Sequence, residues 1–455
     1  GSSSNSIFWF VDNIPSIYPL YMKDATGNNI PDPIYGGSQF DYGESGRKFG
    51  SLTNAIADAT FNTVKSRRNE LNGNTNIKVS FTKYLSFETR LGVQYYNNSF
   101  VNLLNKFYGS AAGQNGSIYQ SRTELLNTNL LKMLRFNKAY GNHSIEALAA
   151  HEATDWRQSF ADASRYNLVS NTSEELNNGV VSTPSTSYTN NFKLESYFAQ
   201  LNYNYDATYY LSATIRRDGS SRFLNDKWGN FGSVGLGWIV SNAAFMDKQK
   251  VFDFLKLKAS YGLIGEQEGV GFYPGYDRFN VDNLNNNPAF AFSTKGNPDL
   301  TWETSQMFQT GIEFRLGNYL TGSVDYYIKN TNDLIFDRRV GPSSGFALIK
   351  VNDGKLRNQG LEWDLTAHLL KKKDYYFDLG INGEHFKNTI TQMPIDPSTG
   401  LPKAIDNQSP YGWAKGGSVF DFYMRNFEGV DPADGLSTWT VFYDELNNDN
   451  TFQAG

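Results

Sequence analysis

Alternation of apolar and polar residues with a period of two is the feature that most constrains the fold of this chain. Between Tyr209 and Ile215 every second residue is apolar, and Ser212 and Thr214 lie on the opposite parity. Between residues 230 and 239, Val, Leu and Trp share one parity, and Ser and Gly occupy the other. Successive side chains of a strand point to opposite faces, so both stretches are predicted to be strands with one apolar and one polar face.

The same alternation recurs along most of the 455 residues and predicts about 12 strands. The expected strands cover residues 77–82, 87–95, 128–137, 144–152, 197–205, 209–216, 230–239, 255–261, 308–316, 320–328, 361–369 and 375–384. Short turns are expected at 83–85, 138–142, 206–208, 317–319 and 370–374. Long loops are expected at about 97–127, 153–190, 264–300, 331–354 and 387–455, with a partly helical link over 240–254. Short turns at one end and long loops at the other are typical of an outer-membrane barrel.

The composition agrees with an all-β, antiparallel transmembrane barrel. Aromatic residues make up 15% of the chain, as interfacial girdles require. The mean hydropathy of -0.50 and the lack of a long apolar run predict no membrane-spanning helix. Barrel strands need only about 9–11 residues, half of them polar, so low hydropathy does not exclude them. The chain has no cysteine, and its net charge of -5 without a basic cluster predicts no nucleic-acid partner.

Three regions follow from this pattern. Residues 1–73 are predicted to be an extracellular loop region with a short helix over 52–70, which Asn72 and Gly73 end. Residues 74–386 are predicted to form the transmembrane strands, with outer loops and periplasmic turns. Residues 387–455 are predicted to be a further extracellular loop region that leaves the barrel incomplete. The N-terminal residues lack the features of a signal peptide, so an exported chain would be a mature product or a fragment.

The polar parity of each strand is expected to face the barrel lumen, and the apolar parity is expected to face lipid. The residues predicted to face lipid are Leu211, Ala213, Ile215, Val234, Leu236, Leu257, Trp363, Leu365, Leu379 and Ile381. The residues predicted to face the lumen are Ser212, Thr214, Ser233, Glu362, Asp364 and Asp378.

No catalytic, cofactor-binding or metal-binding residues are assigned, and the chain is not predicted to be an enzyme. The four histidines do not form a zinc motif, and lumen or turn positions account for them: His143, His151, His368 and His385. Glu362 and Asp364 could be placed like a glycosidase pair, but barrel interiors carry such residues in any case. The segment Asp444–Asn450 is rich in oxygen ligands for calcium but lacks the Gly and closing Glu of an EF-hand loop, so a solvated loop is the plainer interpretation.

Several stretches resemble the SusC/RagA-type TonB-linked outer-membrane proteins, in that family's order. The central one is Arg216-Arg217-Asp218-Gly219-Ser220-Ser221-Arg222-Phe223. The others are Asp12–Pro15 with Ile17–Pro19, Leu257–Gly262, Asn297–Thr304, Tyr326–Ile335 and Asn358–Trp363. The glycine-rich run 262–269 departs from the family pattern. The family's plug domain, its TonB-contact peptide and its final strands have no counterpart in this sequence.

The resemblance implies part of a barrel of about 22 strands in the outer membrane of a gram-negative bacterium. It implies import of a bulky nutrient, either a glycan or a peptide, energised by the TonB complex through the plug and assisted by a SusD-like surface lipoprotein. An alternative is a structural or interaction barrel, such as an adhesin scaffold or a secretion-complex component, because a fold does not fix a function. A soluble glycan-binding β module is a third candidate. A plug with a TonB-contact peptide in the complete gene, and a lipoprotein gene beside it, would favour import.

Two segments could contact ligand or partner. In the central stretch, Arg216 and Arg222 could bind substrate, but a structural role is favoured, in which Gly219 forms a turn and the serines bond nearby backbone. Residues 1–50 are stiffened by four prolines and rich in aromatic residues, which suggests that part of Asp12–Tyr42 contacts the lipoprotein or the substrate. The alternative is that these aromatic residues pack among the loops. No substrate-binding residue is assigned.

Overall fold

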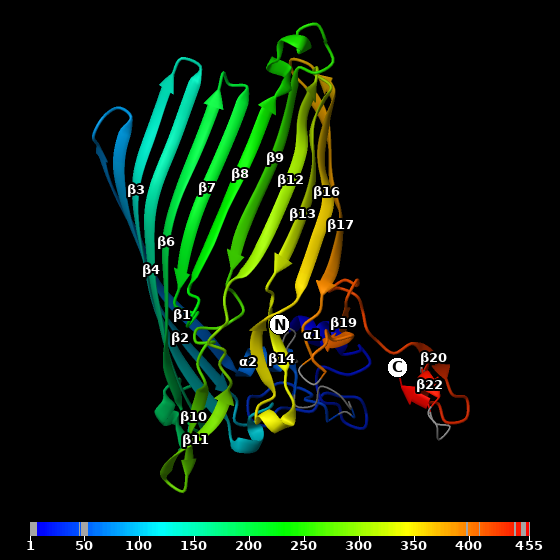
Figure 1. Ribbon diagram of the computed structural model, residues 1–455. Helices are drawn as coiled ribbons and strands as arrows, with labels where there is room; N and C mark the ends of the chain where they lie inside the picture. The colour runs from blue at the N-terminus through cyan, green and yellow to red at the C-terminus, as the bar shows by residue number, and fades with distance from the viewer. Residues whose placement is uncertain are drawn as a thin grey trace. The chain divides into compact units, whose positions relative to one another are not determined.

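The structure is a computed structural model that describes residues 7–44, 46, 53–396, 399–408, 410–440, 443–446 and 452–454. It is built on one 13-stranded sheet in which twelve strands are neighbours in chain order and β5 pairs with β4 (Figure 1). The twelve strands are β1 Thr63–Ser80, β2 Leu85–Leu104, β3 Ser117–Tyr140, β4 His143–Leu168, β6 Thr186–Tyr205, β7 Tyr209–Ser220, β8 Trp228–Ile239, β9 Phe254–Glu266, β12 Glu303–Leu316, β13 Leu320–Asn332, β16 Lys355–Lys371 and β17 Tyr376–Gln392; β5 is Gly179–Ser182. Every pair from β6 to β17 is antiparallel. The number and order of strands agree with the sequence-based prediction.

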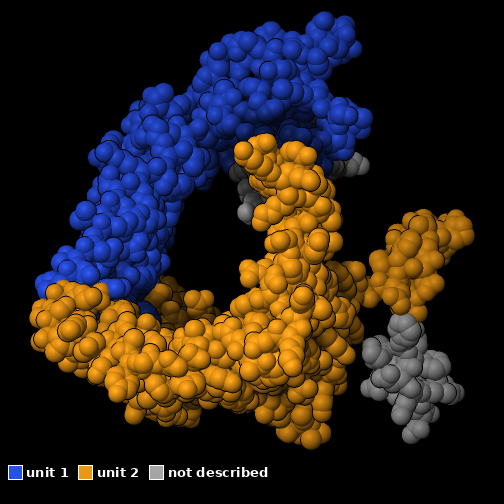
Figure 2. Space-filling model, turned by 90° about the horizontal axis from the view of Figure 1, so that it is seen from above, with its two compact units in different colours: residues 1–77, 89–131, 153–193 blue, residues 78–88, 132–152, 194–455 orange. Residues whose placement is uncertain are grey.

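The chain divides into two compact units, which Figure 2 shows in two colours. Unit 1 comprises Gly1–Ile77, Thr89–Leu131 and Ala153–Lys193. Unit 2 comprises Lys78–Glu88, Lys132–Glu152 and Leu194–Gly455. Each long strand from β1 to β4 therefore contributes one part to each unit.

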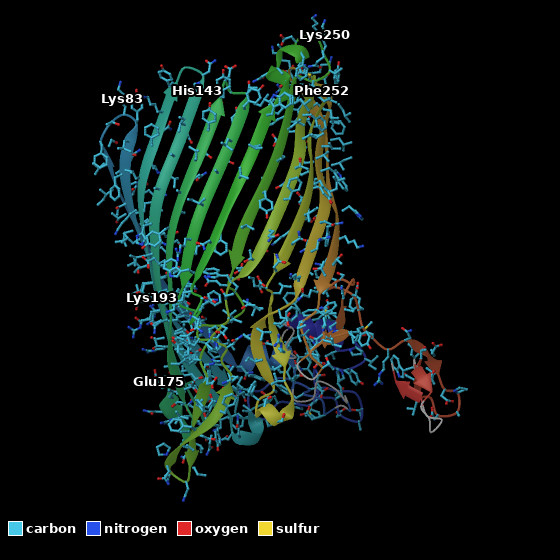
Figure 3. All side chains as sticks on the ribbon, viewed as in Figure 1. Lys83, His143, Glu175, Lys193, Lys250 and Phe252 are labelled. Carbon is cyan, nitrogen blue, oxygen red and sulfur yellow. The ribbon has the colours of Figure 1, made fainter. Side chains whose placement is uncertain are left out.

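The short turns of the sheet all lie in unit 2. They occupy residues 81–84, 141–142, 206–208, 317–319 and 372–375, with the longer link at 240–253. Figure 3 labels Lys83, Lys250 and Phe252 among them, and His143 at the start of β4. Neighbouring turns bond to each other, as in the hydrogen bond from Asp206 N to Asn142 O, 2.7 Å long. We call this the turn end of unit 2 and the opposite end of its strands the loop end. The predicted short turns share this end, because alternate connections of an antiparallel meander return to the same end.

The strand register gathers the predicted apolar residues on one face of unit 2. Residues directly opposite each other on paired strands share a face. Leu211 lies opposite Leu236, which lies opposite Ala259. Leu365 lies opposite Ile381 on the next pair. Ser212, Ser233 and Asp364 lie on the opposite face of the sheet. The residues predicted to face lipid and those predicted to face the lumen are therefore on different faces, and the assignment of one face to lipid stays a prediction.

The predicted loops at 97–127 and 153–190 are wrong, because the strands extend through most of them. Strand β2 extends to Leu104, and β3 begins at Ser117. Strand β4 extends to Leu168, and β6 begins at Thr186. The 26 residues of β4 span roughly 85 Å at 3.3 Å per residue, far more than the ~30 Å hydrocarbon core. Outside lipid both faces can be polar, so the alternation that reveals a strand is lost there.

The predicted helix over 52–70 is also wrong beyond its first two turns. Helix α2 covers Ala55–Phe61, with Asn54 as N-cap accepting from Ala57 N. Strand β1 then begins at Thr63 and runs through Asn72 and Gly73, because pairing with β2 satisfies its backbone. In the region expected to be irregular, Ile7–Asn13 forms helix α1. No helix within the described ranges has the length and apolar character needed to cross a membrane.

The remaining long loops contain hairpins, where structureless chain was predicted. The loop 264–300 contains β10 Arg278–Leu284 and β11 Asn287–Thr294, closed by Asn285 and Asn286 at φ values of 51° and 65°. The loop 331–354 contains β14 Ile335–Arg339 and β15 Leu348–Asn352. Strand β17 extends to Gln392, and three short hairpins follow: β18 Ile405–Gln408 with β19 Tyr411–Ala414, β20 Phe427–Val430 with β21 Ser437–Trp439, and β22 Tyr443–Leu446 with β23 Phe452–Ala454.

Candidate functional site

The central stretch Arg216–Phe223 anchors a packed cluster at the loop end of unit 2. Phe223 is only 1% exposed and contacts the ring of Trp302, with ring centroids 5.3 Å apart. Val270 and Leu300 complete the buried cluster. Trp302 Nε1 donates to Lys227 O at 3.1 Å, which ties the residue before β12 to the connection after β7. We call Phe223, Val270, Leu300 and Trp302 the loop-end junction.

Two of the three arginines of that stretch, Arg216 and Arg222, have structural partners. The guanidinium of Arg216 pairs with Asp218, Nε to Oδ1 2.7 Å, and its Nη2 donates to Ser196 Oγ at 2.9 Å. Arg222 Nη1 donates to Gln267 O at 2.9 Å, and burial lowers the pKa of its guanidinium. Gly219 does not form a turn: it lies within β7, and a Cβ there would meet the Trp228 ring at 2.9 Å. These contacts support the structural role over substrate contact.

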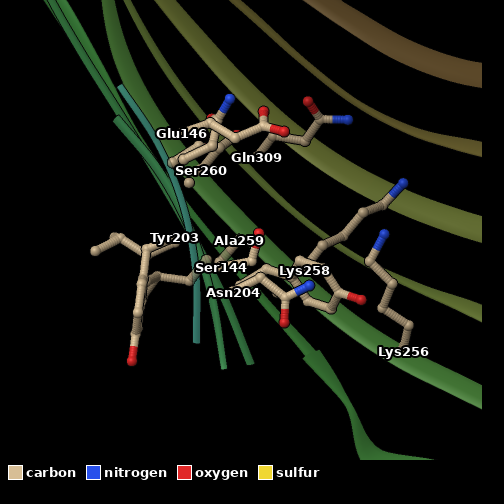
Figure 4. Close-up of a pocket in the computed structure, with 16 residues that line it drawn as sticks. Ser144, Glu146, Tyr203, Asn204, Lys256, Lys258, Ala259, Ser260 and Gln309 are labelled. Atoms are coloured by element: carbon tan, nitrogen blue, oxygen red, sulfur yellow. The ribbon is translucent and has the colours of Figure 1, made fainter. Parts of the chain in front are cut away.

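A second feature is a hollow of about 540 Å³ on the polar face of unit 2, close to the turn end. Figure 4 shows Lys256 and Lys258 on one side of the strands and Tyr203 on the other. The floor is formed by small residues, since a Cβ on Gly235 would lie 2.6 Å from Ser212 Oγ. The polar side chains that line it are Ser144, Glu146, Asn202, Tyr203, Asn204, Tyr210, Ser212, Lys256, Lys258, Ser260 and Gln309. We call this the polar hollow.

Charges in and beside the polar hollow form one network. Lys258 Nζ lies 3.1 Å from Glu313 Oε1 and 3.0 Å from Asp325 Oδ1. Lys256 Nζ lies 3.4 Å from Glu313 Oε2. The positive and negative side chains on this wall are therefore paired with each other, and amide and hydroxyl groups lie between them. Such a wall suits a hydrated solute or a polar protein surface, and the groups named here include no activated nucleophile beside a base. Sequence reasoning missed these lysines, although both lie on the polar parity of β9.

Three of the four histidines contact different partners. His143 Nδ1 lies 2.7 Å from the Tyr203 hydroxyl, and His151 Nε2 lies 3.0 Å from Glu195 Oε1. His368 Nδ1 lies 2.9 Å from Asp378 Oδ1. No group of three or more metal-ligating side chains occurs among the described residues. For the calcium candidate Asp444–Asn450, residues 447–450 and the side chains of 444–446 lie outside the described residues.

Glu362 and Asp364 both belong to the polar parity of β16. Glu362 lies opposite Glu384 of β17, and Asp364 lies opposite Asn382. Tyr327 donates to Glu384 Oε1 at 2.6 Å. The pair is therefore one part of a polar wall.

In unit 1, most aromatic residues of Asp12–Tyr42 pack among the loops. The ring of Tyr35 stacks on Phe61, with centroids 4.4 Å apart, and that of Tyr42 stacks on Tyr108 at 6.1 Å. Burial would raise the pKa of Asp32, but hydrogen bonds from Ile34 N, Tyr35 N and the Tyr108 hydroxyl hold it below its usual value. Burial and the nearby Asp32 carboxylate raise the pKa of Tyr108. The more exposed apolar residues of this region lie in and after α1, with Phe8 83% and Ile17 81% exposed.

Comparison with known proteins identifies the family. The family model described as TonB dependent receptor-like, beta-barrel, matches residues 15–451. This chain belongs to the TonB-dependent receptors. TonB-dependent receptor P39 of Formosa agariphila is 30% identical over 338 residues, which cover 70% of this chain and 31% of that protein. TonB-dependent receptor SusC of Bacteroides thetaiotaomicron is 27% identical over 358 residues, which cover 75% of this chain and 35% of SusC.

Solved structures of the same family share the fold. The RagAB peptide transporter superimposes with a TM-score of 0.77 at 23% identity, over 89% of this chain and 45% of that one. The RagAB peptide importer in its closed-closed state superimposes with a TM-score of 0.78 over 92% of this chain and 46% of that one. The chain is thus a SusC/RagA-type barrel segment that spans about a third of the curated relatives above. TonB-dependent receptor barrels of this kind lie in the outer membrane of gram-negative bacteria and are not enzymes.

Proposed function

We propose that the complete protein imports a bulky nutrient, a glycan or an oligopeptide, across the outer membrane with energy from the TonB complex. The observation that carries this proposal is membership of the TonB-dependent receptor family over nearly the whole chain. The polar face with its satisfied charges supports it, since a wall of paired charges and amides lets a hydrated solute pass without binding it tightly. A plug domain elsewhere in the protein would transmit the energy.

Growth of the source bacterium tests this proposal. Deletion of the complete gene should abolish growth on one member of a panel of oligosaccharides and oligopeptides, and the wild-type gene should restore it. A matched gene that lacks only the TonB-contact peptide should fail to restore it, although its barrel reaches the outer membrane. Full restoration by that variant, or growth of the deletion strain on every nutrient of the panel, would contradict TonB-dependent import.

We further propose that a SusD-like lipoprotein docks on the loops and that α1 and the segment after it take part. The packing of Asp32 and Tyr35 makes deletion of residues 25–42 a poor test, because it would disrupt unit 1. Replacing the exposed Phe8 by Ser should weaken co-purification of the lipoprotein, while the amount of folded barrel stays the same. Phe245→Ser is the matched control, because Phe245 is 67% exposed at the turn end. Equal recovery of the lipoprotein with both variants would exclude α1 from the interface.

A further inference from the structure

A second pocket, of about 440 Å³, lies where the loop after β9 meets the hairpin β14–β15. A parallel bridge between Lys295 and Ile349 joins the end of β11 to β15. Asn297 Nδ2 donates to Lys350 O at 2.8 Å and fixes the same contact. Val270, a member of the loop-end junction, is 3% exposed and forms part of the wall. The pocket, which we call the outer pocket, is therefore built on the buried cluster at the loop end of unit 2.

The interior of the outer pocket is mainly apolar and aromatic. Its apolar lining includes Phe272, Tyr273, Pro274, Phe292, Phe346 and Leu348. The rings of Phe292 and Phe346 lie 6.4 Å apart between centroids, so the two hairpins meet through aromatic side chains. Its described lining contains no Asn, Gln or Trp. The aromatic and aliphatic side chains of this lining would accommodate an apolar side chain of a ligand.

Three basic side chains line the same pocket, and two of them are already neutralised. Lys295 Nζ lies 2.9 Å from Asp277 Oδ2, and Lys350 Nζ lies 2.9 Å from Asp337 Oδ1. Arg278 donates from Nη2 to Thr294 Oγ1 at 3.1 Å and makes no ion pair within the described part of the chain. The pocket therefore retains one positive charge, on a planar group whose remaining donors match a carboxylate.

We propose that the outer pocket binds the C-terminal residue of an oligopeptide, with its carboxylate on the Arg278 guanidinium and its apolar side chain packed against Phe292 and Phe346. A free peptide C-terminus combines a carboxylate and an apolar side chain on one residue, which is the combination that this lining offers. An internal acidic residue supplies only the charge. The inference rests on the proposed import function and narrows its substrate class to peptides.

Isothermal titration of the complete, purified protein tests the assignment. The probes are an acetylated pentapeptide that ends in phenylalanine with a free carboxylate, the same peptide with a C-terminal amide, and trigalacturonate as a carboxylate-bearing sugar. The free acid should bind more tightly than the amide. Arg278→Ala should weaken binding of the free acid by roughly five- to thirtyfold, the factor equivalent to about 1–2 kcal/mol, and leave binding of the amide unchanged.

Two further variants keep the test specific. Arg278→Lys should recover only part of the affinity, because an ammonium group cannot form the two parallel hydrogen bonds of a guanidinium. Arg315→Ala is the matched control, because Arg315 is an exposed arginine at the turn end of β12 and should leave the affinity unchanged. Phe346→Ala should weaken the free acid and the amide equally, since it removes a contact to the side chain alone.

The contrary outcomes are distinct. Equal affinity for acid and amide, or no effect of Arg278→Ala, would overturn the assignment while leaving TonB-dependent import intact. Binding of trigalacturonate that depends on Arg278, without binding of the peptide, would overturn the peptide class. Failure of import itself would instead appear in the growth test, in which removal of the TonB-contact peptide would have no effect.

Discussion

Replacing Phe223 by Ala should selectively loosen the loop end of unit 2. The side chain is 1% exposed and packs on Trp302, Leu300 and Val270, so its removal leaves a cavity in the loop-end junction. Deleting a buried phenylalanine side chain typically costs about 3–5 kcal/mol. Since each 1.4 kcal/mol is a factor of ten, the equilibrium for local opening should rise by roughly two to four powers of ten.

Hydrogen–deuterium exchange of the complete protein in detergent measures that opening. Exchange should accelerate at residues 220–228 and 298–304 and stay unchanged at 206–208 and 317–319, which lie at the turn end. Phe245→Ala, which truncates a phenylalanine that is 67% exposed, should change neither region. If Phe223→Ala leaves the exchange of 298–304 unchanged, Phe223 does not hold the junction together. The structural role of the central stretch would then have to be abandoned.

Three other predictions concern membrane faces, sidedness and pH. Leu365→Arg, opposite Gly322 and Ile381, should destabilise the complete barrel by about 2–4 kcal/mol in reversible unfolding from lipid vesicles, and an equal cost for Ser212→Arg would contradict the assignment of faces. Protease added to intact cells should cut the hairpin tip at Asn285 and spare Lys371–Lys373; a cut at the lysines would invert the topology. Burial raises the pKa of Asp58, so its carboxyl group binds a proton more tightly in the folded state than in the unfolded state. The contribution of Asp58 to the free energy of unfolding therefore falls as the pH rises above the pKa that Asp58 has in the unfolded chain. Asp58→Asn should therefore slow exchange in α2 at pH 7 relative to wild type and have little effect below pH ~4, and faster exchange at pH 7 would contradict this sign.

The sequence by itself determined the strands of unit 2, their faces and the alternation of turns and loops. These features are local, because a strand with one face in lipid and one in water must alternate residue by residue. Leu211 and Ser212 reveal their opposite faces without knowledge of any partner strand. The turns at residues 206–208 and 317–319 are equally local, since their few residues must reverse the chain between two alternating stretches.

Only the tertiary structure decided the features that depend on distant partners. The parts of β3 and β4 that belong to unit 1 lack a regular alternation, and only pairing with neighbouring strands identifies them as strands. Phe223 and Trp302 are far apart in the sequence, and neither residue indicates that the other will cover it. The ion pairs of Lys258 with Glu313 and Asp325 follow from the register of β9, β12 and β13. Register, hairpins within loops and charge partners are set by which strands meet, and a period of two specifies the face of a residue but not its neighbour.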